Sequence, residues 1–188
     1  TWGLLFWAEK HLEKLRSGRF LIFPCLNPHG LRANTRLDQR GLDINRRFHL
    51  PEDPLSGPWS RLIAENPPAL GLCLHEDYDA QGSYVYELSR EQPPVSEKIL
   101  QQCTRRIPRD LRRRIDGRPA KEGIIRRSTI PPDLPGMPEA IVLWQLGCPI
   151  TLTFETPSEL CLQHRIQAQV SFIEAALRFA LPSSAQPA

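Results

Sequence analysis

The chain has 188 residues, of which 40% are hydrophobic, and its 24 Lys and Arg against 21 Asp and Glu give a net charge of +3. This length and apolar content suit one domain with a real core, which we place at residues 1–181, followed by a disordered tail at 182–188. The near balance of charge gives no argument for a nucleic-acid partner. No apolar run approaches the ~18 residues of a membrane span, and the first residues lack the features of a signal peptide.

The spacing of apolar and turn-forming residues predicts a chain in which helices and strands alternate. Apolar residues at 4, 5, 8, 12 and 15 lie on one face of a helix, and residues 20–26 are a strand that is at an edge or bulged at Pro24. The class is therefore α/β, with a mixed, mostly parallel sheet flanked by helices. The other expected elements are a turn at 27–30, an irregular stretch at 49–58, helices at 60–65, 95–107, 139–146 and 162–181, strands at 69–74, 83–88 and 150–154, and a long polar loop at 116–136.

Two arginines and an asparagine lie in a short polar segment in the first quarter of the chain. Arg36 comes first, and Asn45 and Arg46 follow within the Gly-Leu-Asp-Ile-Asn-Arg-Arg-Phe sequence of residues 41–48. A guanidinium group matches a carboxylate bidentately, and a donor beside a reacting carbonyl stabilises an oxyanion. Taken alone, such a segment is also typical of a solvated basic loop.

A histidine and a glutamate each come at the end of an apolar, strand-like run. His75 follows Leu70-Gly71-Leu72-Cys73-Leu74, and Glu155 follows the run from Ile150 to Phe154. In open α/β sheets the ligand crevice lies at the carboxyl ends of the strands, so the two side chains are expected to share one site. A lone histidine at a strand end is otherwise more often structural than a metal ligand.

Together these segments resemble the zinc-dependent carboxypeptidase superfamily, which includes the carboxypeptidase A type enzymes and the aspartoacylase/succinylglutamate desuccinylase branch. The resemblance runs from about residue 20 to residue 157, and its Asp-x-Asn-Arg-x-Phe block is the most specific part. The segments that carry it, in family order, are Asn27-Pro28-His29-Gly30, Arg36, the block at 41–48, Leu74-His75 and Phe154-Glu155-Thr156-Pro157.

The resemblance implies a role for each of these polar residues. His75 would be a zinc ligand, and Glu155 would be the general base that takes a proton from a metal-bound water. Arg36 would polarise the scissile carbonyl, while Asn45 and Arg46 would hold the terminal carboxylate of the substrate.

Two tyrosines and a basic run remain open to more than one interpretation. Tyr84 and Tyr86 match the family segment after the histidine and would line the pocket, or they are core or surface aromatics. Six arginines between residues 105 and 114 form the solvated face of a helix and its turn, or an anion-binding funnel or partner patch. The loop at 116–136 has the length of a functional lid or rim, and Glu139 favours the positive end of a helix.

The sequence departs from the family pattern at one important point. The family has a His-x-x-Glu pair ahead of the first helix that supplies two more zinc ligands, whereas His11 and Glu13 have the wrong spacing and lie within a helical pattern. One histidine cannot hold a catalytic zinc, which ordinarily has three protein ligands. We expect the natural N-terminus to lie upstream of Thr1, with the pair in the missing part; the alternative is a pseudoenzyme that has lost the metal.

These inferences lead to three expectations about function. The first is a zinc-dependent metallocarboxypeptidase-like hydrolase that cleaves an amide bond beside a free carboxylate in a small peptide. The second is an N-acyl amino acid deacylase of the aspartoacylase kind, and the third is a metal-free domain that binds carboxylate ligands. The five cysteines include no Cys-x-x-Cys motif, so we expect neither disulfides nor a zinc finger, and a cytoplasmic location.

Overall fold

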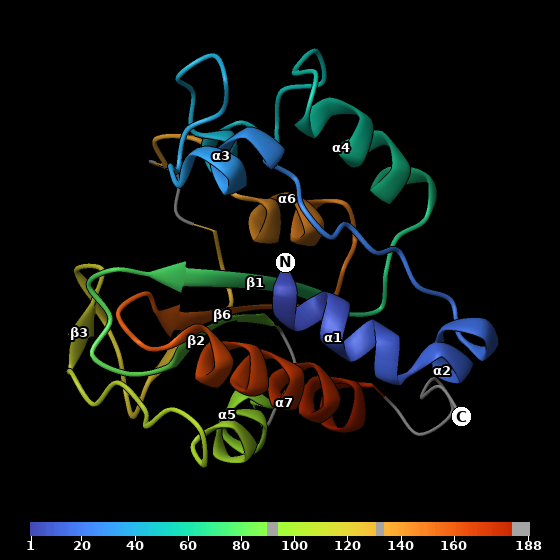
Figure 1. The fold of residues 1–188 in the computed structure, drawn as a ribbon. Helices are drawn as coiled ribbons and strands as arrows, with labels where there is room; N and C mark the ends of the chain where they lie inside the picture. The colour runs from blue at the N-terminus through green and yellow to red at the C-terminus, as the bar shows by residue number, and fades with distance from the viewer. Residues whose placement is uncertain (90–93, 131–133, 182–188) are drawn as a thin grey trace.

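The computed structural model describes residues 1–89, 94–130 and 134–181, so the tail expected at 182–188 lies outside the described residues. Its centre is a four-stranded sheet with the strand order β1–β6–β2–β5 (Figure 1). β1 is parallel to β6, β2 is antiparallel to β6, and β5 is parallel to β2. The mixed, mostly parallel α/β class predicted from the sequence is therefore confirmed. The strands are β1 (Gly71–Asp77), β2 (Tyr84–Ser89), β5 (Ile124–Arg127) and β6 (Ile150–Pro157).

Helices cover both faces of this sheet (Figure 1). The upper layer in that view contains α3 (Pro28–Ala33), α4 (Ser56–Glu65) and α6 (Glu139–Gln145). On the other side α7 (Leu162–Ala180) packs against β6, with α1 (Trp2–Lys10) and α5 (Ser96–Cys103) beside it. Three short elements and one further helix complete the chain: α2 (Leu12–Ser17), the 3-10 turn η1 (Ile44–Arg46), β3 (Arg114–Ile115) and β4 (Arg118–Pro119).

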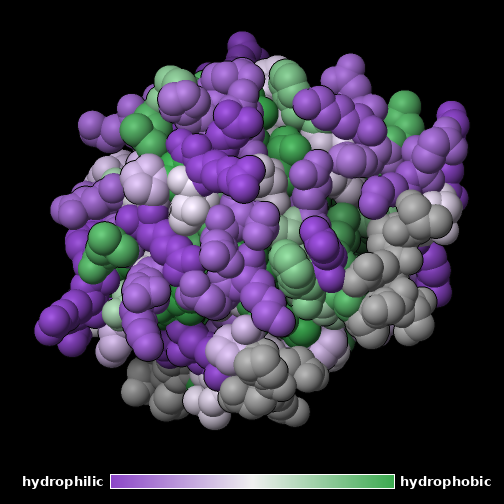
Figure 2. Space-filling model, turned by 90° about the horizontal axis from the view of Figure 1, so that it is seen from below, coloured by the Kyte–Doolittle hydropathy of each residue, from purple (hydrophilic) through white to green (hydrophobic). Residues whose placement is uncertain are grey.

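Strand β6 is the middle of the core because it has a strand on each side and a helical layer on each face. Leu152 and Phe154 are fully buried on the α7 side, where Phe154 stacks on Phe172 with ring centres 4.4 Å apart. Alternate residues of a strand point to opposite faces, so Thr153 and Glu155 face the α6 layer. The underside of the molecule carries mostly hydrophilic side chains (Figure 2), and no helix of the described residues has the length and apolar character to cross a membrane.

The first two elements differ from the sequence-based expectation. The single helix expected from the apolar pattern is divided into α1 and α2 at His11, whose side chain pairs with Glu174 of α7 at 3.1 Å. The strand expected at 20–26 is irregular chain, because Pro24 lacks a donor and none of the described strands pairs with this segment. Its apolar residues pack on helices instead: Phe20 contacts Trp7, and Phe23 contacts Trp59.

Several boundaries and one loop were also predicted wrongly. The turn expected at 27–30 is the start of α3, where the Asn27 side-chain oxygen accepts from the Gly30 backbone N–H. α4 begins within the stretch expected to be irregular. The helix expected at 95–107 ends at Cys103, and the residues up to Pro108 form a turn. The loop expected at 116–136 contains β4 and β5; its residues 131–133 lie outside the described chain.

Candidate functional site

Strand pairing brings three of the predicted side chains together. His75 on β1 is the register partner of Glu155 on β6, and Glu155 is in turn the partner of Tyr84 on β2. Partners in register point to the same face of a sheet, which here is the face under α6. Both strands are longer than expected, so His75 and Glu155 lie within their strands, two residues before Asp77 and Pro157.

The His75 ring lies between two carboxylates. Its Nε2 hydrogen-bonds to Oε1 of Glu139, the first residue of α6, and its Nδ1 lies 3.6 Å from Oε1 of Glu155. Burial alone would lower the pKa of His75, but the two carboxylates outweigh it and raise the pKa to about 9. Without any bound group, the imidazole is therefore a cation at neutral pH.

The two carboxylates respond in opposite directions. Burial raises the pKa of Glu155 to about 7, and the opposing effect of the His75 cation is smaller. For Glu139 the His75 cation and its hydrogen bond outweigh burial, so the pKa of Glu139 is lowered. Each carboxylate also has a buried Oε2 without a hydrogen-bond partner among the described residues. Glu155 is thus a buried acid that exchanges its proton near neutral pH and has a free acceptor oxygen.

A continuous chain of contacts links Arg36 to this pair of strands. Arg36 donates from Nε to Oδ2 of Asp43 at 2.8 Å, and the other oxygen of Asp43 accepts from the Asn45 backbone N–H at 2.9 Å. The Asn45 side-chain oxygen accepts from the backbone N–H of Glu139 at 3.3 Å. Glu139 then contacts His75. The segment from Arg36 to Arg46 and the His75–Glu155 pair are therefore both connected to the first residue of α6.

Arg46 follows on the same block and is held by the segment before α6. The Arg46 backbone oxygen accepts from the Met137 N–H at 3.3 Å, and its guanidinium donates to the Asn45 backbone oxygen at 2.9 Å. Gly136 has a φ of +143° and lies so close that an added Cβ would be 2.4 Å from the Arg46 oxygen. Beside this contact is a cavity of about 530 Å³, lined by Arg46, Asp43, Leu42, His49, Leu134 and Met137 among others, which suits a small ligand.

The two tyrosines differ in their position. Tyr84 is fully buried beside Glu155, and its hydroxyl donates to Asp77 at 2.9 Å. Tyr86 lies farther along β2, and its hydroxyl donates to Asp116 at 2.7 Å. Burial raises the pKa of both phenols, so each remains a neutral donor. Tyr84 reaches the site directly, whereas Tyr86 contacts it through the neighbouring ring, 5.7 Å away.

The donor set was tested against the zinc that the resemblance implies. A metal-binding histidine usually gives its second ring nitrogen to a carboxylate, as His75 gives Nε2 to Glu139, which leaves Nδ1 toward the site. Over residues 1–89, 94–130 and 134–181, however, no group of three or more His, Cys, Asp or Glu side chains is arranged to hold a metal ion. The described residues therefore supply one fitting ligand and do not complete a zinc centre.

Glu139 is the site residue that sequence reasoning assigned differently. It was expected only to favour the helix end, yet its side chain is 10% exposed and contacts a histidine 64 positions earlier in the chain. The sequence signal, a glutamate at the first position of a predicted helix, is common and does not identify such a contact. Only the docking of α6 over β1 makes the contact possible.

The comparisons with known proteins support the fold. No protein-family profile and no curated protein matches the sequence. Among solved structures, a candidate metallopeptidase from Shewanella denitrificans OS217 is 22% identical, with a TM-score of 0.80 over 95% of this chain and 68% of its own. A similar protein from Shewanella amazonensis SB2B is 21% identical, with a TM-score of 0.82 over 97% of this chain and 72% of its own. Another from Shewanella baltica OS155 is 21% identical, with a TM-score of 0.78 over 95% of this chain and 69% of its own. The chain therefore has a metallopeptidase-like fold.

Proposed function

We propose that this site belongs to a metallocarboxypeptidase-like hydrolase that cleaves an amide bond beside a free carboxylate in a small peptide. The observation that carries the proposal is the chain of contacts from Arg36 through Asp43, Asn45 and Glu139 to His75, with Glu155 on the other side of the ring. It joins an anion-binding segment to an acid–base pair, and hydrolysis beside a carboxylate needs both.

Each residue has a role that its surroundings support. Glu155 would take a proton from the attacking water and return it to the leaving amine, since its pKa of about 7 suits exchange in both directions. Arg36, whose side chain is 60% exposed, has terminal N–H groups that are unpaired among the described residues and could donate to the oxyanion of the scissile carbonyl. Arg46 and the amide of Asn45 would bind the terminal carboxylate, and Tyr84 and Tyr86 would bound the pocket.

Zinc is the ion that we propose for the site, with His75 as one ligand through Nδ1. Bound zinc would supply a more acidic water and a Lewis acid for the carbonyl oxygen. The roles given above for Glu155, Arg36 and Arg46 belong to the chain itself and do not depend on which residues complete the zinc ligand set.

One observation favours the metal-free alternative. Both ring nitrogens of His75 face carboxylates, and this arrangement stabilises an imidazolium rather than a neutral ligand. A site of this kind would bind carboxylates through Arg46 and Asn45 without hydrolysing anything. The aspartoacylase-like alternative uses the same groups on an N-acyl amino acid, and a substrate panel separates it from the peptidase.

The test is a panel of N-acylated dipeptides and N-acyl amino acids, incubated with and without added zinc and followed by chromatography of the free amino acid. Because the described residues supply one zinc ligand, we expect release from the dipeptides only where metal analysis shows bound zinc. That release should be lost in Glu155→Gln with dipeptide binding retained, and Arg46→Ala should bind the dipeptides roughly 10- to 100-fold more weakly. Release from acyl amino acids alone would select the deacylase. Arg46-dependent binding with no release under any condition would select the metal-free domain.

A further inference from the structure

A small arginine-rich hairpin forms a second wall of the site. β3 and β4 pair antiparallel, and the buried Ile115 of β3 packs with Tyr84, the register partner of Glu155. The turn residue Asp116 accepts a hydrogen bond from Tyr86 at 2.7 Å. The hairpin is thus fixed to the same sheet face as the site, beside the two tyrosines of β2.

The hairpin is locally rigid. Asp116 and Gly117 have φ angles of 51° and 67°, the left-handed pair of a two-residue hairpin turn that matches the twist of the strands. The ladder continues outward, since Ala120 N–H donates to the Arg113 oxygen at 2.9 Å. Side chains on this element are therefore presented from a defined backbone rather than from a free loop.

The hairpin arginines differ from their neighbours in having no acidic partner among the described residues. Arg109 and Arg112 are paired with Glu97 and Asp110, and those four charges balance. Arg113, Arg114 and Arg118 form no ion pair within the described parts of the chain. The one carboxylate among them, Asp116, is occupied by Tyr86.

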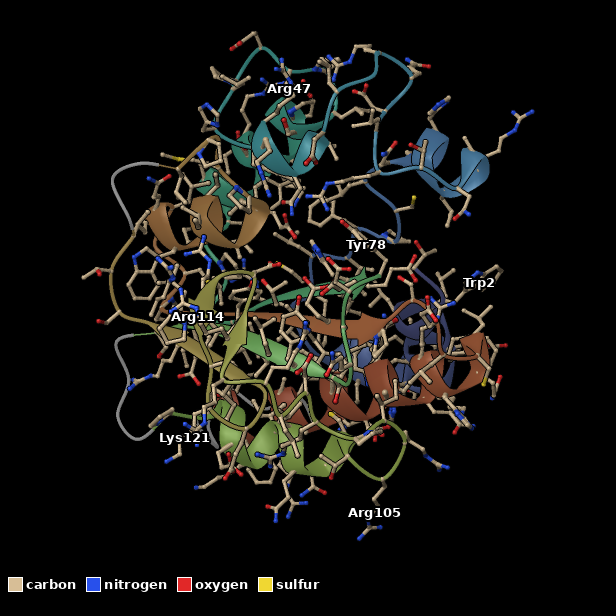
Figure 3. The ribbon with its side chains drawn as sticks, turned by 90° about the vertical axis from the view of Figure 1, so that its left-hand side faces the viewer. Trp2, Arg47, Tyr78, Arg105, Arg114 and Lys121 are labelled. Atoms are coloured by element: carbon tan, nitrogen blue, oxygen red, sulfur yellow. The ribbon has the colours of Figure 1, made fainter. Side chains whose placement is uncertain are left out.

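Arginines are consequently present on both sides of the site. Figure 3 shows the side of the molecule on which β1 ends. On this side Arg114 lies below Arg47 of the upper layer and well away from Arg105, which is at the lower end of the molecule. The segment that carries Arg36 and Arg46 is joined to the α6 side of the site through Asn45 and Glu139, and the hairpin is joined to the Tyr84 side through Ile115. Arg118 is the register partner of Ile115 and shares its face, whereas Arg114 lies on the opposite face and donates to the Gly117 backbone oxygen. A ligand that leaves the site between that segment and the hairpin meets positive charge on both sides, which favours a chain with several carboxylates.

We propose that the β3–β4 hairpin binds the side-chain carboxylates of an acidic peptide whose C-terminal end lies at Arg46. The position of the C-terminal end rests on the proposed function, whereas binding along the hairpin does not. Arg113 and Arg114 are exposed and Arg118 is half-buried. Guanidinium forks match carboxylates, and three such contacts together strengthen binding about tenfold at moderate salt. The substrate class is then an acidic peptide rather than a peptide of any composition.

The test is fluorescence anisotropy of a labelled hexa-aspartate peptide on the full chain at 0.15 M salt. The triple variant Arg113→Gln, Arg114→Gln, Arg118→Gln should bind about tenfold more weakly. A matched control that also loses three exposed charges, Lys98→Gln, Arg105→Gln, Arg106→Gln, should change binding less than about twofold. Thermal melts of both variants verify that they are folded.

Three results would overturn the proposal. The first is equal weakening in the hairpin variant and the control, which would indicate unspecific attraction to positive charge. The second is equal binding of the neutral hexa-asparagine peptide, and the third is tighter binding of an oligonucleotide with six phosphates, which would make the hairpin a nucleic-acid surface.

A peptide with a C-terminal amide separates this proposal from the proposed function. If the amide binds and remains sensitive to the hairpin variant while no substrate is ever hydrolysed, the hairpin proposal stands and the hydrolase proposal falls. If dipeptides are hydrolysed but the hairpin variant does not change acidic-peptide binding, the hairpin proposal is wrong and the hydrolase proposal stands.

Discussion

Replacing Glu139 by Gln should destabilise the metal-free protein in a manner that depends on pH. His75 has a pKa of about 9 in the folded chain against an ordinary value of 6.5, a difference that corresponds to about 3 kcal/mol of folding free energy. Because the folded value is the higher one, this stabilisation is fully present below about pH 6.5 and is lost as the pH rises through about 9.

Glu139 is the largest source of the stabilisation, since it exceeds Glu155 among the groups that raise the His75 pKa. Glu139→Gln keeps the shape of the side chain and removes its charge, so the variant should lose about 2 kcal/mol at pH 6. At pH 10 His75 is neutral in both proteins, and wild type then holds a buried carboxylate with no cation beside it. The difference in unfolding free energy should therefore shrink toward zero or change sign.

Urea denaturation in the presence of a chelator, followed by circular dichroism at pH 6 and pH 10, measures both differences. Glu76→Gln is the matched control: Glu76 adjoins His75 in sequence, but its carboxylate is 54% exposed and pairs with Arg165. This control should lose less than about 1 kcal/mol, and equally at the two pH values. A Glu139→Gln loss of the same size at pH 6 and pH 10 would refute the ion-pair interpretation of the His75–Glu139 contact.

Two further substitutions test the segment that carries Arg46. Gly136→Ala should lower the unfolding free energy by ~1–3 kcal/mol and weaken carboxylate binding, because its Cβ would lie 2.4 Å from the Arg46 backbone oxygen. Gly41→Ala is the control: Gly41 has a φ of +73° but lies in open space, so this variant should leave carboxylate binding unchanged in the same binding titrations. Asp53→Asn should cost ~3–5 kcal/mol in urea, because Asp53 is a fully buried partner of Arg47. Burial opposes ionisation of Asp53, but the hydrogen bond from Arg47 holds its pKa far below 3.8. The difference in unfolding free energy between wild type and Asp53→Asn should therefore persist above about pH 4 and disappear as the pH falls further. A constant difference down to about pH 2 would contradict the assignment.

The parts of the fold that could be predicted are those that depend on local pattern. The continuous apolar run before His75 and the β-prone run before Glu155 give two strands, and parallel pairing then brings both side chains to one edge of a sheet. The long amphipathic helix α7 was predicted to within a residue because its apolar stripe repeats over five turns. These signals need no information from distant residues.

The parts that could not be predicted depend on what a segment packs against. Residues 20–26 are as apolar as a strand, but their partners are the aromatic rings of helices rather than a neighbouring strand. Strand β5 has only four residues within a polar stretch, and its pairing with β2 makes it a strand. Glu139 belongs to the same class, since its importance comes from a contact between elements that the sequence keeps far apart.

Glu139 connects the segment that carries Asn45 to the His75–Glu155 pair, and this connection has a measurable consequence. Asn45 accepts from the backbone N–H of Glu139, and the Glu139 side chain holds His75, so the two contacts share one residue. Removing either contact loosens the start of α6, so that removing the second contact costs less additional folding free energy. Asn45→Ala and Glu139→Gln combined should therefore destabilise the chain by less than the sum of the single effects, with a coupling of ~0.5 kcal/mol or more in urea denaturation at pH 6. Strict additivity would mean that the segment carrying Asn45 and the His75–Glu155 pair are independent features that merely adjoin the same helix.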